Sequence, residues 1–162
     1  MAAAHESGVQ VIHAIAERRP DGRGASRNAR LFRAAERLPV QQLSGTRAVR
    51  VAPPIEVADT DLVVRRLPGR LSPPTGTGVD PLLRNLGCRT LIVTGVSVDV
   101  ALPNAVFAVV NHGSVAVVPA DAIAGVPSDC TPAMIRNTLA LVSTVTSTDY
   151  VSSCVRRPRR SA

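Results

Sequence analysis

Residues 90–113 read TLIVTGVSVDVALPNAVFAVVNHG, and this stretch decides the fold class of the chain. It begins with an apolar, β-branched run at 90–95, which is typical of a strand buried on both faces. A turn follows, and the apolar pattern at 100–113 predicts a helix that ends at Gly113, where a left-handed residue is expected. A strand, a turn and a returning helix form the repeating unit of a parallel sheet.

The same alternation continues on both sides of this stretch. Further strands are predicted at 8–16, 61–66 and 114–121, with a weaker candidate at 148–153. Helices are predicted between them at 26–38, 78–87 and 131–144. This order predicts an α/β fold, a three-layer, Rossmann-like and mostly parallel sheet with helices on both faces. Ligands bind to such sheets beyond the carboxyl ends of the strands.

The composition fits one domain. The chain has 162 residues, of which 45% are apolar and only 2% aromatic. A chain of this length can bury a substantial core, which here must be built from Val, Ala, Leu and Ile. We expect a single domain over residues 1–154, followed by a basic tail at 155–162.

The charge balance is strongly basic, with a formal net charge of +7, and every cationic residue is an arginine. The absence of lysine excludes any mechanism that requires a lysine amine. The arginines are scattered except for RRPRR at 156–160, which fits a solvated tail better than a nucleic-acid interface. Nucleic acid is therefore not the expected partner, although an Arg-rich nucleic-acid binder stays open as an alternative.

The cysteine pattern and the hydropathy indicate a cytoplasmic protein. Cys88, Cys130 and Cys154 are widely spaced and form no CxxC motif or Cys/His cluster, so we expect no disulfide framework, metal or cofactor. No apolar run is long enough to span a membrane, and the first residues carry no signal-peptide pattern. We therefore predict a soluble protein of the reducing cytosol with no membrane partner.

Four stretches, taken in order, carry a resemblance to a known family. They are AERRPDGRGASRNARLF (16–32), SPPTGTGVDPLLRNLGCRTLIVTGVSVDVAL (72–102), AVVNHGSVAVVPADAIAG (108–125) and NTLALVSTVTSTDYV (137–151). The chain resembles the isochorismatase-like cysteine hydrolases, which include isochorismatases, nicotinamidases and N-carbamoyl amidohydrolases. This resemblance implies a parallel six-stranded sheet and hydrolysis of an amide or vinyl ether bond.

The resemblance also implies a catalytic triad, which this sequence does not reproduce. In the family an Asp at the end of the first strand acts as base, a Lys at the end of the third supports it, and a Cys opening the helix after the fourth attacks. Ala101 stands at the Cys position, and Arg65 or Arg66 stands at the Lys position. No strand that could carry the Asp precedes AAAHESG at 2–8. A guanidinium keeps the positive charge but cannot exchange a proton near neutral pH.

The resemblance implies a pocket around the turn before the predicted helix, where the Val96–Ser97 peptide is often cis and backbone N–H groups form an oxyanion hole. The residues implied to line it are Arg66, Gly95, Val96, Ser97, Asp99 and Ala101.

Three side chains remain as weaker catalytic candidates. Cys130 precedes a predicted helix whose N-terminus could lower its pKa, although Asp129 opposes this effect. His13, expected at the end of the first strand, could reach the pocket or could be a core histidine. Ser97 has no His and base that we can identify as its partners.

The missing strand has a physical consequence. In the family the first strand is central, between the second and the fourth, so its absence leaves two rows of backbone groups unpaired inside a core. A longer native chain or a partner chain could supply the strand, and we expect a homo-oligomer. The sequence thus predicts a hydrolase-family protein with a degenerate triad, inactive, which binds a small acidic molecule or a partner subunit. An active hydrolase with another nucleophile stays open as an alternative.

Overall fold

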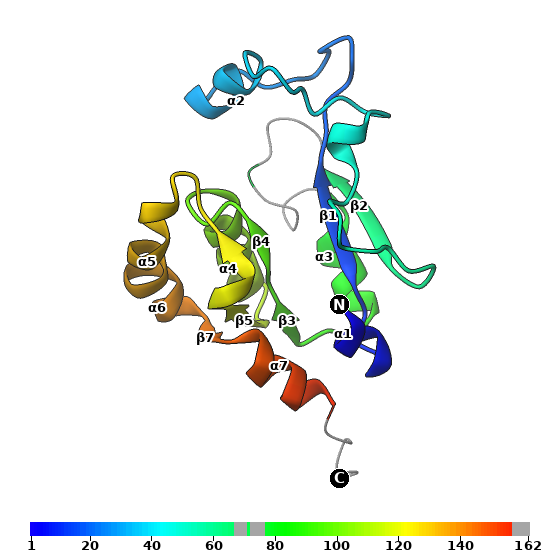
Figure 1. The fold of residues 1–162 in the computed structure, drawn as a ribbon, viewed down its shortest axis with the longest axis vertical. Coiled ribbons are helices and arrows are strands. Elements are labelled where there is room, and N and C mark those ends of the chain that lie inside the picture. Colours follow the sequence, from blue (N-terminus) through cyan, green and yellow to red (C-terminus); the bar gives the residue numbers. More distant parts are fainter. Residues whose placement is uncertain (67–70, 72–76, 157–162) are drawn as a thin grey trace.

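The computed structural model describes residues 1–66, 71 and 77–156. The strands in this part of the chain form three parallel ladders (Figure 1). The first pairs β1 (Ile12–Ala16) with β2 (Leu62–Arg66). The second has the order β3–β5–β7 and consists of β3 (Thr90–Ile92), β5 (Val115–Pro119) and β7 (Thr144–Thr146). The third pairs β4 (Gly95–Val96) with β6 (Ile123–Ala124). All pairs are parallel, as the sequence predicts.

Helices connect and cover these ladders. They are α1 (Ala2–Glu6), α2 (Arg30–Ala35), α3 (Val79–Asn85), α4 (Ala101–Asn111), α5 (Thr131–Met134), α6 (Ala140–Val142) and α7 (Thr148–Val155). A π-helical turn at Ile135–Leu139 joins α5 to α6, and 3-10 turns lie at Arg47–Val49, Ala120–Ala122 and Ser128–Cys130. The α4 helix packs on β5, and α1 contacts α7. The chain has the three-layer, Rossmann-like α/β fold that the sequence predicts.

Most of the predicted elements are present. The strands predicted at 61–66 and 114–121 correspond to β2 and β5, and the helix predicted at 100–113 corresponds to α4. Gly113 follows α4 with a φ of +78°, which confirms the left-handed position that ends the helix. The helix predicted at 26–38 is reduced to α2.

The strand predicted at 148–153 is wrong, because these residues form α7. The Ser147 side chain accepts a hydrogen bond from the Tyr150 N–H at 3.3 Å and so caps this helix. The last strand, β7, lies just before it. The tail expected from residue 155 overlaps the last residue of α7, and 157–162 lie outside the described residues.

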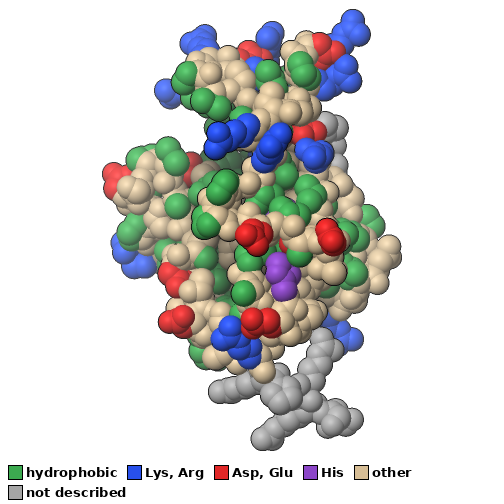
Figure 2. All heavy atoms as spheres, turned by 45° about the vertical axis from the view of Figure 1, so that its right-hand side comes forward, with side chains coloured by type: hydrophobic (Ala, Val, Ile, Leu, Met, Phe, Trp, Pro, Cys, Tyr) green, Lys and Arg blue, Asp and Glu red, His purple; other side chains and the backbone are tan. Residues whose placement is uncertain are grey.

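The hydrophobic core lies in one half of the molecule. Its buried members come from residues 98–139 and are Val98, Leu102, Val106, Val109, Ala116, Val118 and Leu139. No residue of β1 or β2 is fully buried, and Val63 of β2 is 43% exposed. Apolar side chains are spread over the surface, and arginines gather at the end that carries α2 (Figure 2).

The total accessible surface area is large for a chain of this mass. The chain exposes 10769 Å², whereas a compact monomer of this mass exposes about 7,700 Å². The chain thus exposes more surface than a compact monomer of its mass.

The expected single sheet is divided. Among the described residues, β1 pairs only with β2, and β3 pairs only with β5, so no hydrogen bond joins the two ladders. The division lies between β1 and β3 (Figure 1), where the family resemblance places the absent central strand. The facing edges therefore have unused backbone donors and acceptors within the part of the chain that the structure describes.

Candidate functional site

The turn between β4 and α4 is held by its own backbone. The Val96–Ser97 peptide is cis, as the resemblance implies, and Gly95 has a φ of +110° that disfavours residues with a side chain. The Ser97 carbonyl accepts the Leu102 N–H at 3.0 Å, and the Val98 N–H donates to the β6 carbonyl of Ala124 at 2.9 Å. These bonds fix the turn against the first turn of α4 and against β6.

The polar side chains of this turn bind each other and the neighbouring loop. The Asp99 carboxylate accepts the Val126 N–H at 3.3 Å. Desolvation opposes the ionisation of Asp99, but bonds from backbone N–H groups and from the Ser97 side chain outweigh it and lower the pKa of Asp99. A carboxylate with a lowered pKa is a weak base, so it is poorly suited to activate the Ser97 hydroxyl.

Ala101 is the first residue of α4 and is half-buried. The family resemblance predicts the attacking cysteine at this position, the helix N-terminus, where a thiolate would be favoured. Its methyl group can neither attack a carbonyl carbon nor form a thioester.

The two arginines at the end of β2 have different environments. Arg65 donates to the Glu17 carboxylate at 2.7 Å, and its side chain is 54% exposed. Successive side chains of a strand point to opposite faces. Arg66 therefore lies on the other face of β2, where burial lowers the pKa of its guanidinium. Of the two candidates for the lysine position, Arg66 is the one with a partly desolvated charge.

Cys130 lies near this turn, but its thiol is not activated. It belongs to the 3-10 turn at 128–130 and is exposed. Desolvation and the carboxylates of Asp129 and Asp99 raise the pKa of the Cys130 thiol. The lowering expected from the following helix is outweighed, because that helix, α5, has only four residues and two carboxylates lie nearby.

His13 is placed differently from the sequence prediction. It is the second residue of β1, not the last, and its side chain is 9% exposed. The imidazole Nε2 lies 2.9 Å from Asp61 Oδ2, at the amino end of the strands and away from Ala101. The prediction that His13 reaches the pocket is wrong, and the alternative of a core histidine describes its environment.

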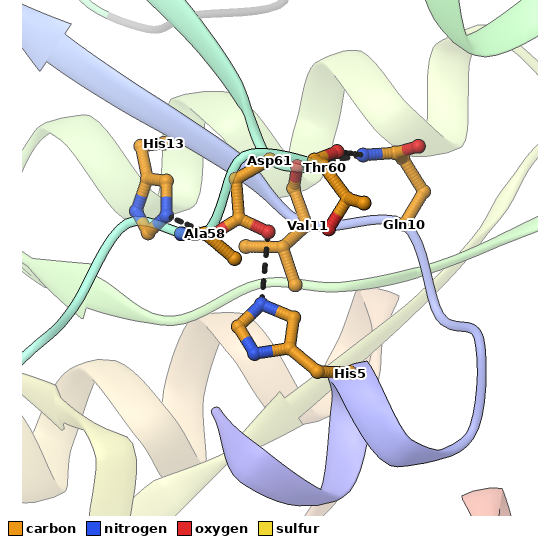
Figure 3. Close-up of polar contacts among 7 residues, drawn as sticks. All are labelled: His5, Gln10, Val11, His13, Ala58, Thr60 and Asp61. Atoms are coloured by element: carbon orange, nitrogen blue, oxygen red, sulfur yellow. Dashed lines mark hydrogen bonds and ion pairs between the residues drawn. The ribbon is translucent and has the colours of Figure 1, made fainter.

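His13 belongs to a cluster that the sequence analysis missed (Figure 3). The Asp61 carboxylate is 1% exposed, and it lies 2.8 Å from His5 Nε2 and 3.0 Å from the donating Ala58 N–H. Burial opposes its ionisation, but hydrogen bonds from His13, Ala58 and His5 outweigh this and lower the pKa of Asp61 to about 2. The cluster joins α1, β1 and the residue before β2. No local spacing reveals it, because its members are far apart in the sequence.

Within the described residues, no three His, Cys, Asp or Glu side chains are grouped as a metal site would require. In the same part of the chain, no helix combines the length and apolar character needed to cross a membrane.

The fold and the turn before α4 agree with the result of a family comparison. The isochorismatase domain model matches residues 1–150. The chain belongs to the isochorismatase family. No significant match was found among curated proteins.

Solved structures of isochorismatase-family proteins share this fold. A cysteine hydrolase from Pseudomonas syringae pv. phaseolicola superposes with a TM-score of 0.83 at 21% identity, over 95% of this chain and 75% of that chain. An isochorismatase family protein from Desulfovibrio vulgaris gives 0.82 at 22% identity, over 96% and 80%. The pyrazinamidase of Pyrococcus horikoshii in complex with zinc gives 0.73 at 13% identity, over 90% and 79%. At these sequence identities the similarity concerns the fold alone.

Proposed function

We propose that this isochorismatase-family chain does not use a cysteine nucleophile and instead binds a small anionic molecule between Arg66 and the start of α4. The observation that carries the proposal is the methyl group of Ala101 at the first position of α4, close to a turn of the family type.

The neighbouring side chains do not replace the missing thiol. Desolvation and two carboxylates disfavour the thiolate of Cys130. The Ser97 side chain helps to lower the pKa of Asp99, and the lowered pKa makes that carboxylate a weak base. Both arrangements argue against the alternative of an active hydrolase with another nucleophile.

Two features favour an anion. The guanidinium of Arg66 is partly buried, and an arginine guanidinium forms charge-assisted hydrogen bonds to carboxylates. The 11-residue helix α4 begins at the same edge and its dipole favours negative charge there, although Pro103 has no N–H and the Leu102 N–H already donates to the Ser97 carbonyl. The Asp99 carboxylate, bonded to Val126, repels an anion, so the ligand is expected nearer to Arg66.

Adjacent arginines provide a matched test. We expect small carboxylates, presented as a panel with their amides, to raise the melting temperature of the wild-type protein and of Arg65→Ala but not of Arg66→Ala. No amide should be hydrolysed. Turnover of an amide that is lost in Cys130→Ser or Ser97→Ala would instead establish the active hydrolase. Equal stabilisation of both arginine variants would contradict the assigned site.

The divided sheet supports a second proposal, a partner subunit. We propose that a polypeptide strand from a partner pairs with the facing edges of β1 and β3. Parallel strands are usually buried on both faces, and Ile92 of the edge strand β3 is 38% exposed, which leaves apolar surface beside such a strand.

Native mass spectrometry and hydrogen exchange test this partnership. In the complex isolated from the host, the edge amides of β1 and β3 should be protected, and they should exchange rapidly in the isolated chain. If the edge amides of β1 and β3 were as well protected in the isolated monomer as in the complex, the proposed partnership would be contradicted. An intact mass above 17.0 kDa for the chain itself would place the strand in the same polypeptide.

The nucleic-acid alternative depends on the arginines at 156–160. All but Arg156 lie outside the described residues, so this alternative stays a prediction. Salt-steep binding to DNA or RNA that is lost on removal of 156–160 would support it.

A further inference from the structure

A second group of polar side chains lies at the other end of α4. His112 follows the last residue of α4, and its Nδ1 lies 3.0 Å from Asp80 Oδ1. The second oxygen of the same carboxylate accepts Arg84 Nη2 at 2.5 Å. Because α4 has 11 residues, this group is separated from Ala101 by about 16 Å along the helix axis. It is therefore distinct from the site proposed above.

The carboxylate sets the orientation of the imidazole. Asp80 is 18% exposed on its side chain and is held by Arg84, so it accepts from Nδ1–H of His112. A histidine whose Nδ1 donates to a carboxylate in its neutral form has its Nε2 available as a proton acceptor. This Asp–His arrangement is the one that orients a general base in nucleophilic catalysis.

A thiol lies in the same place. A cavity of about 30 Å³ is lined by Asp80, Arg84 and His112 together with Cys88, and its apolar wall includes Leu91 and Val109. Cys88 is half-buried, whereas Cys130 and Cys154 are exposed. The volume suffices for one or two molecules of the size of water, and Cys88 and His112 both line the cavity that such a molecule would occupy.

We propose that Cys88 is a peroxide-reactive thiol, with His112 as its proton acceptor and Asp80 as the residue that positions His112. The substrate class is a small hydroperoxide, with hydrogen peroxide as its simplest member. The cavity is too small for a bulky disulfide, so its size selects among oxidants.

The reaction balances within this group. His112 Nε2 takes the Cys88 proton, and the thiolate sulfur attacks one peroxide oxygen, forming an S–O bond as the O–O bond breaks. The sulfur is oxidised to a sulfenic acid and the peroxide is reduced. The departing hydroxide takes the proton from the imidazolium and leaves as water.

The test compares two thiols in the folded protein. One variant carries Cys130→Ser and Cys154→Ser and retains Cys88 as its only thiol. The other variant carries Cys88→Ser and Cys130→Ser and retains Cys154 as its only thiol. Hydrogen peroxide is added at pH 7, and the sulfenic acid is trapped with dimedone and counted by mass spectrometry. We expect Cys88 to react at least about a hundredfold faster than Cys154, the low end of what an oriented base contributes. A bulky aromatic disulfide should show the reverse order.

His112→Asn and Asp80→Asn, made in the Cys88-only protein, separate a chemical role from a structural one. Both should slow the peroxide reaction about a hundredfold and shift its pH profile, while the melting temperature of His112→Asn stays near that of its parent because the His112 side chain is 43% exposed. A Cys88 rate equal to or below that of Cys154 overturns the proposal, even if both of these variants fail to fold. An unchanged rate in a folded His112→Asn protein overturns the role of the imidazole.

Discussion

The imidazole of His13 and the carboxylate of Asp61 connect the first two strands through an Nε2–Oδ2 contact of 2.9 Å, with side chains 9% and 1% exposed. His5 on α1 contacts the other carboxylate oxygen, so one acidic side chain joins three segments of a half that lacks a buried apolar core. A polar cluster therefore contributes to holding together the part of the molecule where hydrophobic burial is weakest.

Asp61→Asn should lower the melting temperature markedly. The amide that replaces the carboxylate carries no charge and has one acceptor oxygen, so at least one histidine loses its partner in a buried position. His5→Asn should have a smaller effect, because the His5 side chain is 30% exposed. Asp59→Asn, two residues away and exposed, is the matched control and should leave the melting temperature unchanged. Equal melting temperatures for the two aspartate variants would contradict the structural role of Asp61.

The lowered pKa of Asp61 predicts that the stability of the fold decreases at acid pH. The pKa of Asp61 is about 2 in the folded chain against an ordinary value of 3.8. The folded pKa is depressed, so its contribution is fully present above about pH 5 and is lost as the pH falls through 4 towards 2. The difference in unfolding free energy between wild type and Asp61→Asn, measured by denaturant titration, should shrink over that range. A difference that stays constant from pH 6 to pH 2.5 would exclude this linkage.

The strands β1, β2, β3 and β5 and the long helix α4 could be predicted because their signals are local. The apolar run at 90–95 and Gly113 are each readable within a short window of sequence. The resemblance also led to the turn at Val96–Ser97 and to Ala101, because these positions are defined by their distance from the apolar run.

What the sequence did not predict depends on contacts between distant residues. The start of α7 is fixed partly by Asp121, which accepts the Thr148 N–H at 2.9 Å from a loop much earlier in the chain. The β-branched residues at 148–153 favoured a strand instead. The His5–Asp61–His13 cluster was likewise hidden, because parallel pairing of β1 with β2 brings His13 near a residue 48 positions later.

Ala101→Cys tests whether the start of α4 still provides the environment of the family nucleophile. The helix N-terminus favours a thiolate there, so iodoacetamide at pH 7 should alkylate the new thiol about tenfold faster than that of Cys154. Asn104→Cys, one turn into the same helix, is the matched control and should react no faster than Cys154. We expect no amide hydrolysis from either variant, because no base has been identified beside residue 101. Hydrolysis by Ala101→Cys would show that the site holds a base that neither the sequence nor the geometry identifies.

Within the half that contains the β3–β5–β7 sheet, a buried core position and an exposed edge position should differ in their cost to stability. Leu139 is fully buried in the cluster that joins α4, β5 and the π-helical turn, so Leu139→Ala should lower the unfolding free energy by about 2 to 5 kcal/mol. Ile92 of β3, at the uncovered edge, is 38% exposed, and Ile92→Ala should cost about 1 kcal/mol or less in the isolated chain. If a partner strand covers that edge, the second substitution should become costly only in the complex, where it should weaken association. Denaturant titration of the isolated chain and of the complex measures both effects, and a large loss for Ile92→Ala in the isolated chain would mean that the edge is already covered.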